Sequence, residues 1–357
     1  MTNSPAAAPN GIDPARGQTL IDVRDLKKFF PVKMGIFQHA GLMVKAVDGV
    51  SFSLHSGETL GIVGESGCGK STTARLLMHL IEPDAGEIVL DGQAVGGKEG
   101  LTVNELRRQV QMVFQDSYAS LNPRLPIQDT IAFGPTVHGV PRQEARDRAL
   151  GLLESVGLQP DQFGKRYPHE LSGGQRQRIN VARALALQPR VIILDEAVSA
   201  LDKSVEAQVL NLLVDLKAEF DLTYIFISHD LNVVQYMSDR VLVMYLGKVV
   251  ELGAVDEIYG NPRHPYTQAL LQSRPSMDPE QRIDEAPITG DPPNPINPPS
   301  GCRFHTRCPF AEEVCATTEP PLYTKSGADA VDHAVACHME EAGSGHSRAQ
   351  SQSGETP

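Results

Sequence analysis

The sequence lacks the features that mark a membrane-spanning or secreted protein. No run of apolar residues approaches the roughly 18 needed to cross a bilayer. The first twenty residues show no basic start followed by an apolar stretch, so we expect no secretory signal. Basic residues are outnumbered, because 32 Lys and Arg stand against 44 Asp and Glu, a net charge of −12. An acidic chain is a poor candidate for bulk binding to nucleic acid or anionic lipid, so we expect no nucleic-acid partner.

Cysteine is scarce over most of the chain. Cys68 stands alone, and the other four cysteines lie in the last sixth of the sequence, at Cys302, Cys308, Cys315 and Cys337. Without a secretory signal we expect a reducing compartment, in which a disulfide framework is not favoured. The four late cysteines therefore indicate a metal, an iron–sulfur cluster or no ligand at all.

Apolar residues make up 41% of the chain, enough for a packed core. At roughly 150 residues per domain, 357 residues correspond to about two domains. Short apolar runs alternate with helical patterns, which is typical of an α/β fold with parallel strands. We expect strands at residues 58–63, 191–194, 224–227 and 240–246. A helix with apolar Leu76, Leu77, Leu80 and Ile81 follows the first strand.

The composition divides the rest of the chain. Residues 1–19 and 342–357 are polar or rich in small residues and show no hydrophobic periodicity. We therefore expect a disordered N-terminal lead and a disordered C-terminal tail. Residues 116–183 have helical periodicity and indicate a helical insert in the α/β core. Residues 261–341 are dense in proline and hold the four late cysteines, so we expect a loop-rich extension there.

Residues Gly64–Ser71 (GESGCGKS) match the G-x-x-x-x-G-K-[ST] phosphate loop, placed after a strand and before a helix. The glycines let backbone N–H groups face the phosphates of ATP, and the helix N-terminus adds positive potential. Lys70 can reach the β- and γ-phosphates, and the Ser71 hydroxyl can ligate Mg²⁺. The alternative is a plain glycine-rich turn. The candidate nucleotide-binding residues of this segment are Gly64, Glu65, Ser66, Gly67, Cys68, Gly69, Lys70, Ser71 and Thr72.

An acidic pair, Asp195 and Glu196, follows the strand at residues 191–194. A carboxylate at the end of that strand can hold Mg²⁺ opposite Ser71. Glu196 would then be placed to polarise the attacking water as a general base. The alternative is an exposed acidic pair at a strand end.

Residues Leu171–Gln175 (LSGGQ) resemble the signature of ATP-binding-cassette (ABC) ATPases, and further family motifs follow at the expected intervals. Gln115 matches the Q-loop glutamine, His229 the switch histidine and Asp202 the D-loop. Phe30 stands where the family places an aromatic ring against adenine, although it could be a core residue. The resemblance implies a P-loop NTPase cassette over residues 20–260, with a parallel-sheet core, an antiparallel β-subdomain and a helical insert.

The resemblance also implies roles for individual residues. Glu196, His229 and Lys70 would be catalytic, and Ser71, Gln115 and Asp195 would hold Mg²⁺. The signature residues would contact ATP bound by a partner cassette, because the family clamps two ATP molecules between two cassettes. The chain carries one motif set, so dimerisation is implied. These signature residues are Ser172, Gly173, Gly174 and Gln175.

Several stretches resemble one subfamily, the ATP-binding subunits of oligopeptide and dipeptide importers. The sequence Gly-Cys-Gly at Gly67–Gly69 is similar to that of the second of the two sister ATPases in this subfamily, the "F" type. Ser117, Ala197 and Lys203 depart from the residues most common there, without removing a functional group. The matching stretches are Tyr118–Pro123, Ser228–Val234, Val243–Lys248 and Asn261–Thr267.

This subfamily has a cysteine-rich extension, and its cluster-bearing members imply a 4Fe-4S cluster on the four late cysteines. The spacing C-x5-C-x6-C-x21-C lacks the C-x2-C knuckles of common zinc sites, and four thiolates suit such a cluster. Zn²⁺ or no cofactor remain alternatives. His305 and His338 lie close enough in sequence to act as substitute ligands, or are ordinary polar residues of a loop-rich region.

The resemblance therefore implies an ATPase that uses ATP and Mg²⁺ to power uptake of di- or oligopeptides. Its implied partners are a sister ATPase, two transmembrane permeases and an extracytoplasmic substrate-binding protein. The implied location is peripheral, at the cytoplasmic face of the bacterial inner membrane. The alternatives are import of another solute, such as nickel or glutathione, a non-transport ABC ATPase, or a redox regulator built on the cassette fold.

Overall fold

A large sheet organises the chain. The computed structural model describes residues 17–32, 42–97, 100–274, 290–324 and 333–349. The sheet has the strand order β11-β12-β10-β9-β3-β8-β7-β6, in which β9, β3, β8, β7 and β6 run parallel. This confirms the parallel-sheet core. Its strands are β3 Thr59–Val63, β6 Val110–Val113, β7 Val191–Asp195, β8 Thr223–Ile227, β9 Arg240–Tyr245, β10 Lys248–Ala254, β11 Tyr323–Thr324 and β12 Ala334–Val335.

The parallel strands are apolar along their length because both faces of the sheet are covered. Every residue of β3, β7 and β8 is buried. Alternate residues divide between two cores: Ile193 packs with α1 and the smaller sheet, whereas Ile192 and Leu194 pack with the helical side. This is the pattern expected of a parallel sheet between two layers.

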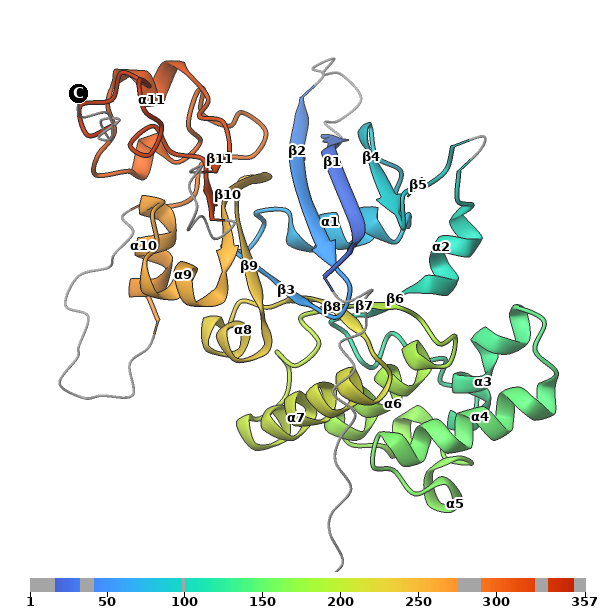
Figure 1. The fold of residues 1–357 in the computed structure, drawn as a ribbon. Coiled ribbons are helices and arrows are strands. Elements are labelled where there is room, and N and C mark those ends of the chain that lie inside the picture. The colour runs from blue at the N-terminus through green and yellow to red at the C-terminus, as the bar shows by residue number, and fades with distance from the viewer. Residues whose placement is uncertain (1–16, 33–41, 98–99, 275–289, 325–332, 350–357) are drawn as a thin grey trace, which may run out of the picture.

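A second, antiparallel sheet packs beside α1 and forms the β-subdomain, in the order β2-β1-β4-β5. Figure 1 shows it at the top, the helices α3 to α6 at the lower right and the C-terminal extension at the upper left. The antiparallel subdomain implied by the family resemblance is confirmed. Its strands are β1 Thr19–Pro31, β2 Met43–His55, β4 Ala85–Leu90 and β5 Gln93–Ala94.

The helices fall into three groups. Those next to the sheets are α1 Lys70–Leu77, α2 Val103–Gln109, α7 Lys203–Glu219, α8 Leu231–Met237, α9 Val255–Gly260 and α10 Pro265–Gln272. The helical insert holds α3 Ile127–Val137, α4 Arg142–Ser155, α5 Pro160–Phe163, a 3-10 turn at Pro168–Glu170 and α6 Gly173–Leu185. The extension holds a 3-10 turn at His305–Arg307 and α11 Glu313–Thr317. In the part of the chain that the structure describes, no helix combines the length and apolarity needed to cross a membrane.

Helix α1 ends sooner than its apolar spacing predicts. His79 adopts a left-handed conformation with φ +51. The Leu80 N–H donates to the Arg75 carbonyl (2.9 Å), and the His79 N–H donates to the Leu76 carbonyl (2.8 Å). These two bonds form a Schellman motif, which satisfies the last carbonyls and stops the helix. Leu80 therefore lies beyond the helix and is exposed.

The boundaries of the expected lead and tail differ from the structure. Strand β1 begins at Thr19, within the stretch expected to be a lead, and residues 1–16 lie outside the described part. Residues 342–349 fold against the extension rather than leaving it. His346 is buried, and its Nε2 donates to the Phe310 carbonyl at 2.9 Å. The remaining tail residues, 350–357, lie outside the described part.

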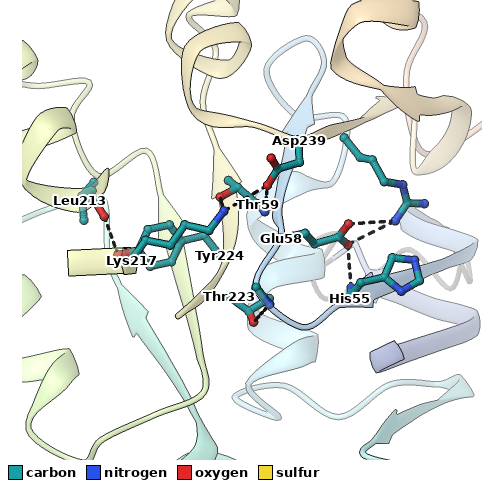
Figure 2. Close-up of polar contacts among 10 residues, drawn as sticks. His55, Glu58, Thr59, Leu213, Lys217, Thr223, Tyr224 and Asp239 are labelled. Carbon is teal, nitrogen blue, oxygen red and sulfur yellow. Dashed lines mark hydrogen bonds and ion pairs between the residues drawn. The ribbon is translucent and has the colours of Figure 1, made fainter. Parts of the chain in front are cut away.

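Polar contacts gather at the amino ends of β3, β8 and β9 (Figure 2). The Asp239 carboxylate accepts from the Thr59 N–H (2.7 Å) and from the Lys217 ammonium (3.1 Å). The buried Tyr224 hydroxyl donates to the Leu213 carbonyl at 3.0 Å. The phosphate-loop motif and Asp195 lie at the carboxyl ends of β3 and β7, which is the edge where open parallel sheets bind ligands.

Candidate functional site

The phosphate loop connects β3 to α1 and needs glycine at two positions. Gly64 has φ +146, and a Cβ there would lie 2.2 Å from the Met244 carbonyl oxygen. Gly69, the N-cap of α1, has φ +113, and a Cβ there would lie 2.3 Å from the Ala46 carbonyl oxygen. Both positions exclude a side chain by conformation and by space. The loop backbone therefore packs directly against β2 and β9 at these two glycines.

The Lys70 side chain folds back onto the phosphate loop and bonds to its backbone carbonyls. Its Nζ donates to the carbonyls of Gly64 (2.7 Å) and Glu65 (3.0 Å), and its side chain is nearly buried. It also lies 3.7 Å from the Cys68 sulfur. Because an ammonium carries three donors, this group can exchange its carbonyl partners for phosphate oxygens without moving far.

Ser71 and Asp195 meet across the site, as expected of a pair that shares a metal ion. The Ser71 hydroxyl donates to Asp195 Oδ1 at 2.9 Å. Burial raises the pKa of the Asp195 carboxyl above its ordinary value, although the Ser71 hydrogen bond opposes this shift. A hydroxyl and a carboxylate oxygen are ligands that suit Mg²⁺.

Glu196 stands next to this pair and contacts the two other predicted site residues. Gln115 Nε2 donates to Glu196 Oε2 at 2.8 Å, and His229 Nδ1 lies 3.7 Å from the same oxygen. Glu196 has φ +49, a conformation held by its N–H donating to the Ile227 carbonyl (2.9 Å). This geometry aims its carboxylate away from the strand and toward Gln115.

The remaining nucleotide candidates lie around the loop. Ser66 and Gly67 are exposed on it, Cys68 is buried beneath it, and Thr72 is in the first turn of α1. Phe30, near the end of β1, is 36% exposed and therefore not a core residue. The Lys28 ammonium lies 5.7 Å from the centre of its ring. An exposed ring of this kind is available for stacking.

The signature residues form the start of α6, in the helical insert rather than beside the phosphate loop (Figure 1). Ser172 caps the helix: its hydroxyl accepts from the Gln175 N–H (3.3 Å), and Gln175 Oε1 accepts from the Ser172 N–H (3.0 Å). This capping box fixes the first turn. A Cβ on Gly174 would lie 2.4 Å from Val205 Cγ1, so α7 packs directly on the turn.

Asp202 is the N-cap of α7, where its carboxylate accepts from the Val205 N–H at 3.0 Å. The next residue, Lys203, bridges to Asp230 (2.9 Å) and Glu206 (3.0 Å). Asp230 follows the switch histidine in sequence, so Lys203 connects the D-loop to the switch segment. From the sequence alone, Lys203 was only a departure from the residue most common in the subfamily.

Sequence reasoning missed two residues that touch the phosphate loop. The Glu65 N–H donates to the Tyr266 hydroxyl (2.8 Å), and the Glu65 carboxylate binds the Arg307 guanidinium (2.8 and 3.1 Å). Arg307 is 242 residues from Glu65 in sequence. No short motif reports a contact of that range, so the sequence held no signal for it.

The four late cysteines line one small cavity of the extension together with Phe304, Phe310 and Met339. Burial raises the pKa of Cys302 to about 11 and that of Cys337 to about 12, and it also raises that of Cys308. The extension is therefore folded so that all four cysteines border the same cavity.

Two histidines of that region are engaged with the backbone. A ring nitrogen of His305 donates to the Cys302 carbonyl (2.8 Å), and one of His338 donates to the Thr318 carbonyl (2.9 Å). Within the described residues, no group of three or more His, Cys, Asp or Glu side chains is arranged to hold a metal ion.

Comparison with known families matches two parts of the chain. Residues 47–199 match the family described as "ABC transporter", and residues 250–315 match the family described as "Oligopeptide/dipeptide transporter, C-terminal region". The first range contains the phosphate loop, the signature and the acidic pair. The second contains three of the four late cysteines.

Curated proteins resemble the chain over most of its length. The "Oligopeptide transport ATP-binding protein AppF" of Bacillus subtilis is 51% identical over 329 residues, covering 91% of this chain and 98% of that protein. The "Dipeptide transport ATP-binding protein DppF" of Escherichia coli is 48% identical, covering 87% and 92%. Among solved structures, CbiO1 of Clostridium perfringens, part of the ABC transporter complex CbiONQ, superposes with a TM-score of 0.58 at 27% identity, covering 68% of this chain and 91% of that one.

Proposed function

This chain belongs to the ATP-binding subunits of oligopeptide and dipeptide ABC transporters, and from that premise we propose that it hydrolyses ATP to drive uptake of di- or oligopeptides. The observation that carries the proposal is the match over both the cassette and the C-terminal region. Relatives named for oligopeptide and dipeptide transport cover about nine-tenths of the chain at 48–51% identity.

The site geometry supports a division of chemical roles. Lys70 and the loop N–H groups would bind the phosphates of ATP. Ser71 and Asp195 would hold Mg²⁺, which would supply positive charge to the triphosphate. Glu196 accepts a proton from the attacking water as general base. Gln115 and His229 converge on the Glu196 carboxylate and orient it and the water.

The signature residues act on ATP bound by another cassette. Ser172, Gly173, Gly174 and Gln175 lie at the N-terminus of α6, a position that favours an anion. We propose a heterodimer with a sister ATPase, in which each signature faces the partner's phosphate loop. Mixing this chain with the sister subunit and ATP tests this, since ATP would then raise the mass of the complex to that of the dimer.

The permease contact lies over the segment after Gln115 and helix α3. Phe133 and Val137 are one helical turn apart on α3 and 61% and 66% exposed, and Tyr118 is 52% exposed. Large apolar side chains in such exposed positions favour a protein partner. We assign these exposed side chains to contact with one of the two transmembrane permease subunits, which would place the chain peripherally at the cytoplasmic face of a bacterial inner membrane.

The signature helix also holds the segment that would meet the permease. Asn180 Nδ2 donates to the Ser117 carbonyl at 3.0 Å, and the Arg183 guanidinium donates to the Ser120 carbonyl. A displacement of residues 117–120 would therefore be transmitted to α6. This connection supports the proposal that permease state and signature position change together.

We propose that the four late cysteines ligate a 4Fe-4S cluster, with Zn²⁺ as the alternative. Four thiols line one cavity of a segment with few regular elements, and thiolates are the ligands of such clusters. To bind iron, each cysteine would have to lose its thiol proton. The segment would gain order from the ligation.

Protein purified without oxygen tests the cluster. We expect brown protein with absorbance near roughly 400 nm and a loss of colour in Cys308→Ser. Cys68→Ser is the matched control, because Cys68 lies in the phosphate loop and not in the cavity of the four late cysteines. The brown colour of this variant should persist. About one equivalent of zinc with no iron would reject the cluster.

The transport assignment is tested through an extracytoplasmic binding protein, the remaining proposed partner. Peptide-loaded binding protein should stimulate ATP hydrolysis by the assembled transporter more than unloaded protein does. Stimulation by nickel or glutathione instead would assign a different solute. ATP hydrolysis that responds to neither permease nor binding protein would favour a non-transport ATPase.

A further inference from the structure

An ion pair connects the C-terminal extension to the phosphate loop. Arg307 Nη1 donates to Glu65 Oε2 at 2.8 Å, and Nη2 donates to Oε1 at 3.1 Å, so the ion pair is bidentate. Only 6% of the Arg307 side chain and 25% of the Glu65 side chain are exposed. A bidentate ion pair that is largely shielded from water is stronger and more directional than an ordinary surface ion pair.

Aromatic packing holds Arg307 at this position. It ends the 3-10 turn His305–Arg307, and the preceding Phe304 is buried edge-on against Tyr245, with ring centres 5.4 Å apart. The Arg307 guanidinium lies 5.9 Å from the centre of the Tyr245 ring and donates to its hydroxyl at 3.3 Å. The turn next to Cys308 is thereby anchored to β9 and delivers the guanidinium to the loop.

A second residue outside the cassette holds the Glu65 main chain. The Glu65 N–H donates to the Tyr266 hydroxyl at 2.8 Å, and Tyr266 lies on α10. The Tyr266 ring packs against Tyr245 and Phe304, with ring centres 4.6 and 5.4 Å apart. Both the side chain and the backbone of Glu65 are therefore held by residues that follow the cassette in sequence.

The charge of Glu65 has a consequence for ATP. Glu65 is the second residue of the loop that receives a triphosphate, and its carboxylate has the same sign as the phosphates. Charges in a partly buried site are screened less than charges in water, so an uncompensated carboxylate there would repel the ligand. Arg307 supplies the compensating charge.

We propose that Arg307 is a positioning residue for the phosphate loop: by pairing with Glu65 it neutralises a carboxylate beside the triphosphate, so that ATP affinity depends on the C-terminal extension. This rests on ATP binding at the loop, as proposed above. The extension thus contributes to the nucleotide site of its own chain, in addition to any cluster it holds.

Equilibrium binding of Mg-ATP to the full-length chain tests the proposal. We expect Arg307→Gln to raise the ATP Kd roughly tenfold, equivalent to about 1.4 kcal/mol. The matched control is Arg303→Gln. Arg303 is also a buried arginine of the extension and binds Asp48 and the Leu246 carbonyl, so it tethers the extension without touching Glu65. Its ATP Kd should stay within about threefold of the wild type, a change of less than 0.7 kcal/mol.

A double substitution separates charge from packing. In Arg307→Gln combined with Glu65→Gln the uncompensated carboxylate is gone, and we expect most of the lost affinity to return. Equal weakness of the single and double variants would overturn the charge argument. An unchanged Kd in Arg307→Gln would overturn the proposal while leaving ATP binding intact, whereas a wild type that does not bind ATP would overturn the proposed function itself.

Arg307→Lys covers the case in which Arg307→Gln does not fold. It keeps the positive charge beside Glu65, so its ATP Kd should stay within about threefold of the wild type. If Arg307→Lys binds ATP as the wild type does and the folded double variant does too, neutralisation is the property that matters, which supports the proposal. Weak binding by both would count against it.

Discussion

Replacement of Glu196 by glutamine tests the proposed catalytic base with the least disturbance of its surroundings. Glu196 Oε2 accepts from Gln115 (2.8 Å), and the side-chain amide oxygen of glutamine can accept the same bond. Glutamine has the same shape and can adopt the same backbone conformation, φ +49. We therefore expect the free energy of unfolding to change by less than about 0.5 kcal/mol. What the amide loses is the ability to take a proton from water.

The expected loss of turnover follows from that single property. General-base catalysis contributes about 10²–10⁴-fold, which corresponds to about 2.7–5.5 kcal/mol of the activation barrier. Phosphate release by the assembled transporter should fall by that factor in Glu196→Gln, while ATP binding to the variant stays measurable. A closed cassette dimer should accumulate, because ATP binds and is not hydrolysed.

Two measurements bracket this prediction. Glu87→Gln, which changes a surface carboxylate on β4, should keep wild-type turnover. Turnover above about one third of the wild type in Glu196→Gln would show that another group is the base, because that loss is under 0.7 kcal/mol and far below the contribution of a general base.

Two further predictions concern the signature turn and the core. Gly174→Leu should stop transport while ATP binding at the chain's own phosphate loop stays measurable, because the added side chain collides with Val205 (2.4 Å from the Cβ) at the surface that meets the partner's ATP. Equal loss of nucleotide binding in an isolated chain would mean that the signature acts in cis. Tyr224→Phe should lower the free energy of unfolding, measured in urea, by about 1–2 kcal/mol, because the Leu213 carbonyl loses a buried donor. Its ATP Kd should not change, and a shift would show that the two ends of the sheet are coupled.

Local motifs made the cassette predictable from sequence. The phosphate loop combines a strand, a glycine-rich turn and a helix within a short stretch, and both ends of the motif are confirmed as β3 and α1. Buried apolar runs likewise predict β7, β8 and β9 because parallel strands carry apolar residues on both faces. These runs do not give the order of the strands in the sheet, which the structure shows.

The features that the sequence did not predict depend on backbone geometry or on distant contacts. The end of α1 depends on the left-handed conformation of His79, which apolar spacing does not report. The place of the extension depends on pairs such as His333 with the buried Glu251 (2.7 Å), and on Arg307 with Glu65. His346 looked like part of a polar tail, yet it is buried and hydrogen-bonded to the Phe310 carbonyl. Such contacts exist only after the chain has folded.

Peptide uptake by the reconstituted transporter tests the central claim most directly. Proteoliposomes would contain this chain, its sister ATPase and both permeases, with ATP and Mg²⁺ on the side of the cassettes and a labelled tripeptide with its binding protein on the other. We predict that the peptide accumulates with wild-type protein and that accumulation stops in Glu196→Gln. Accumulation that continues in Glu196→Gln, or none with the wild type under conditions in which it hydrolyses ATP, would contradict the account.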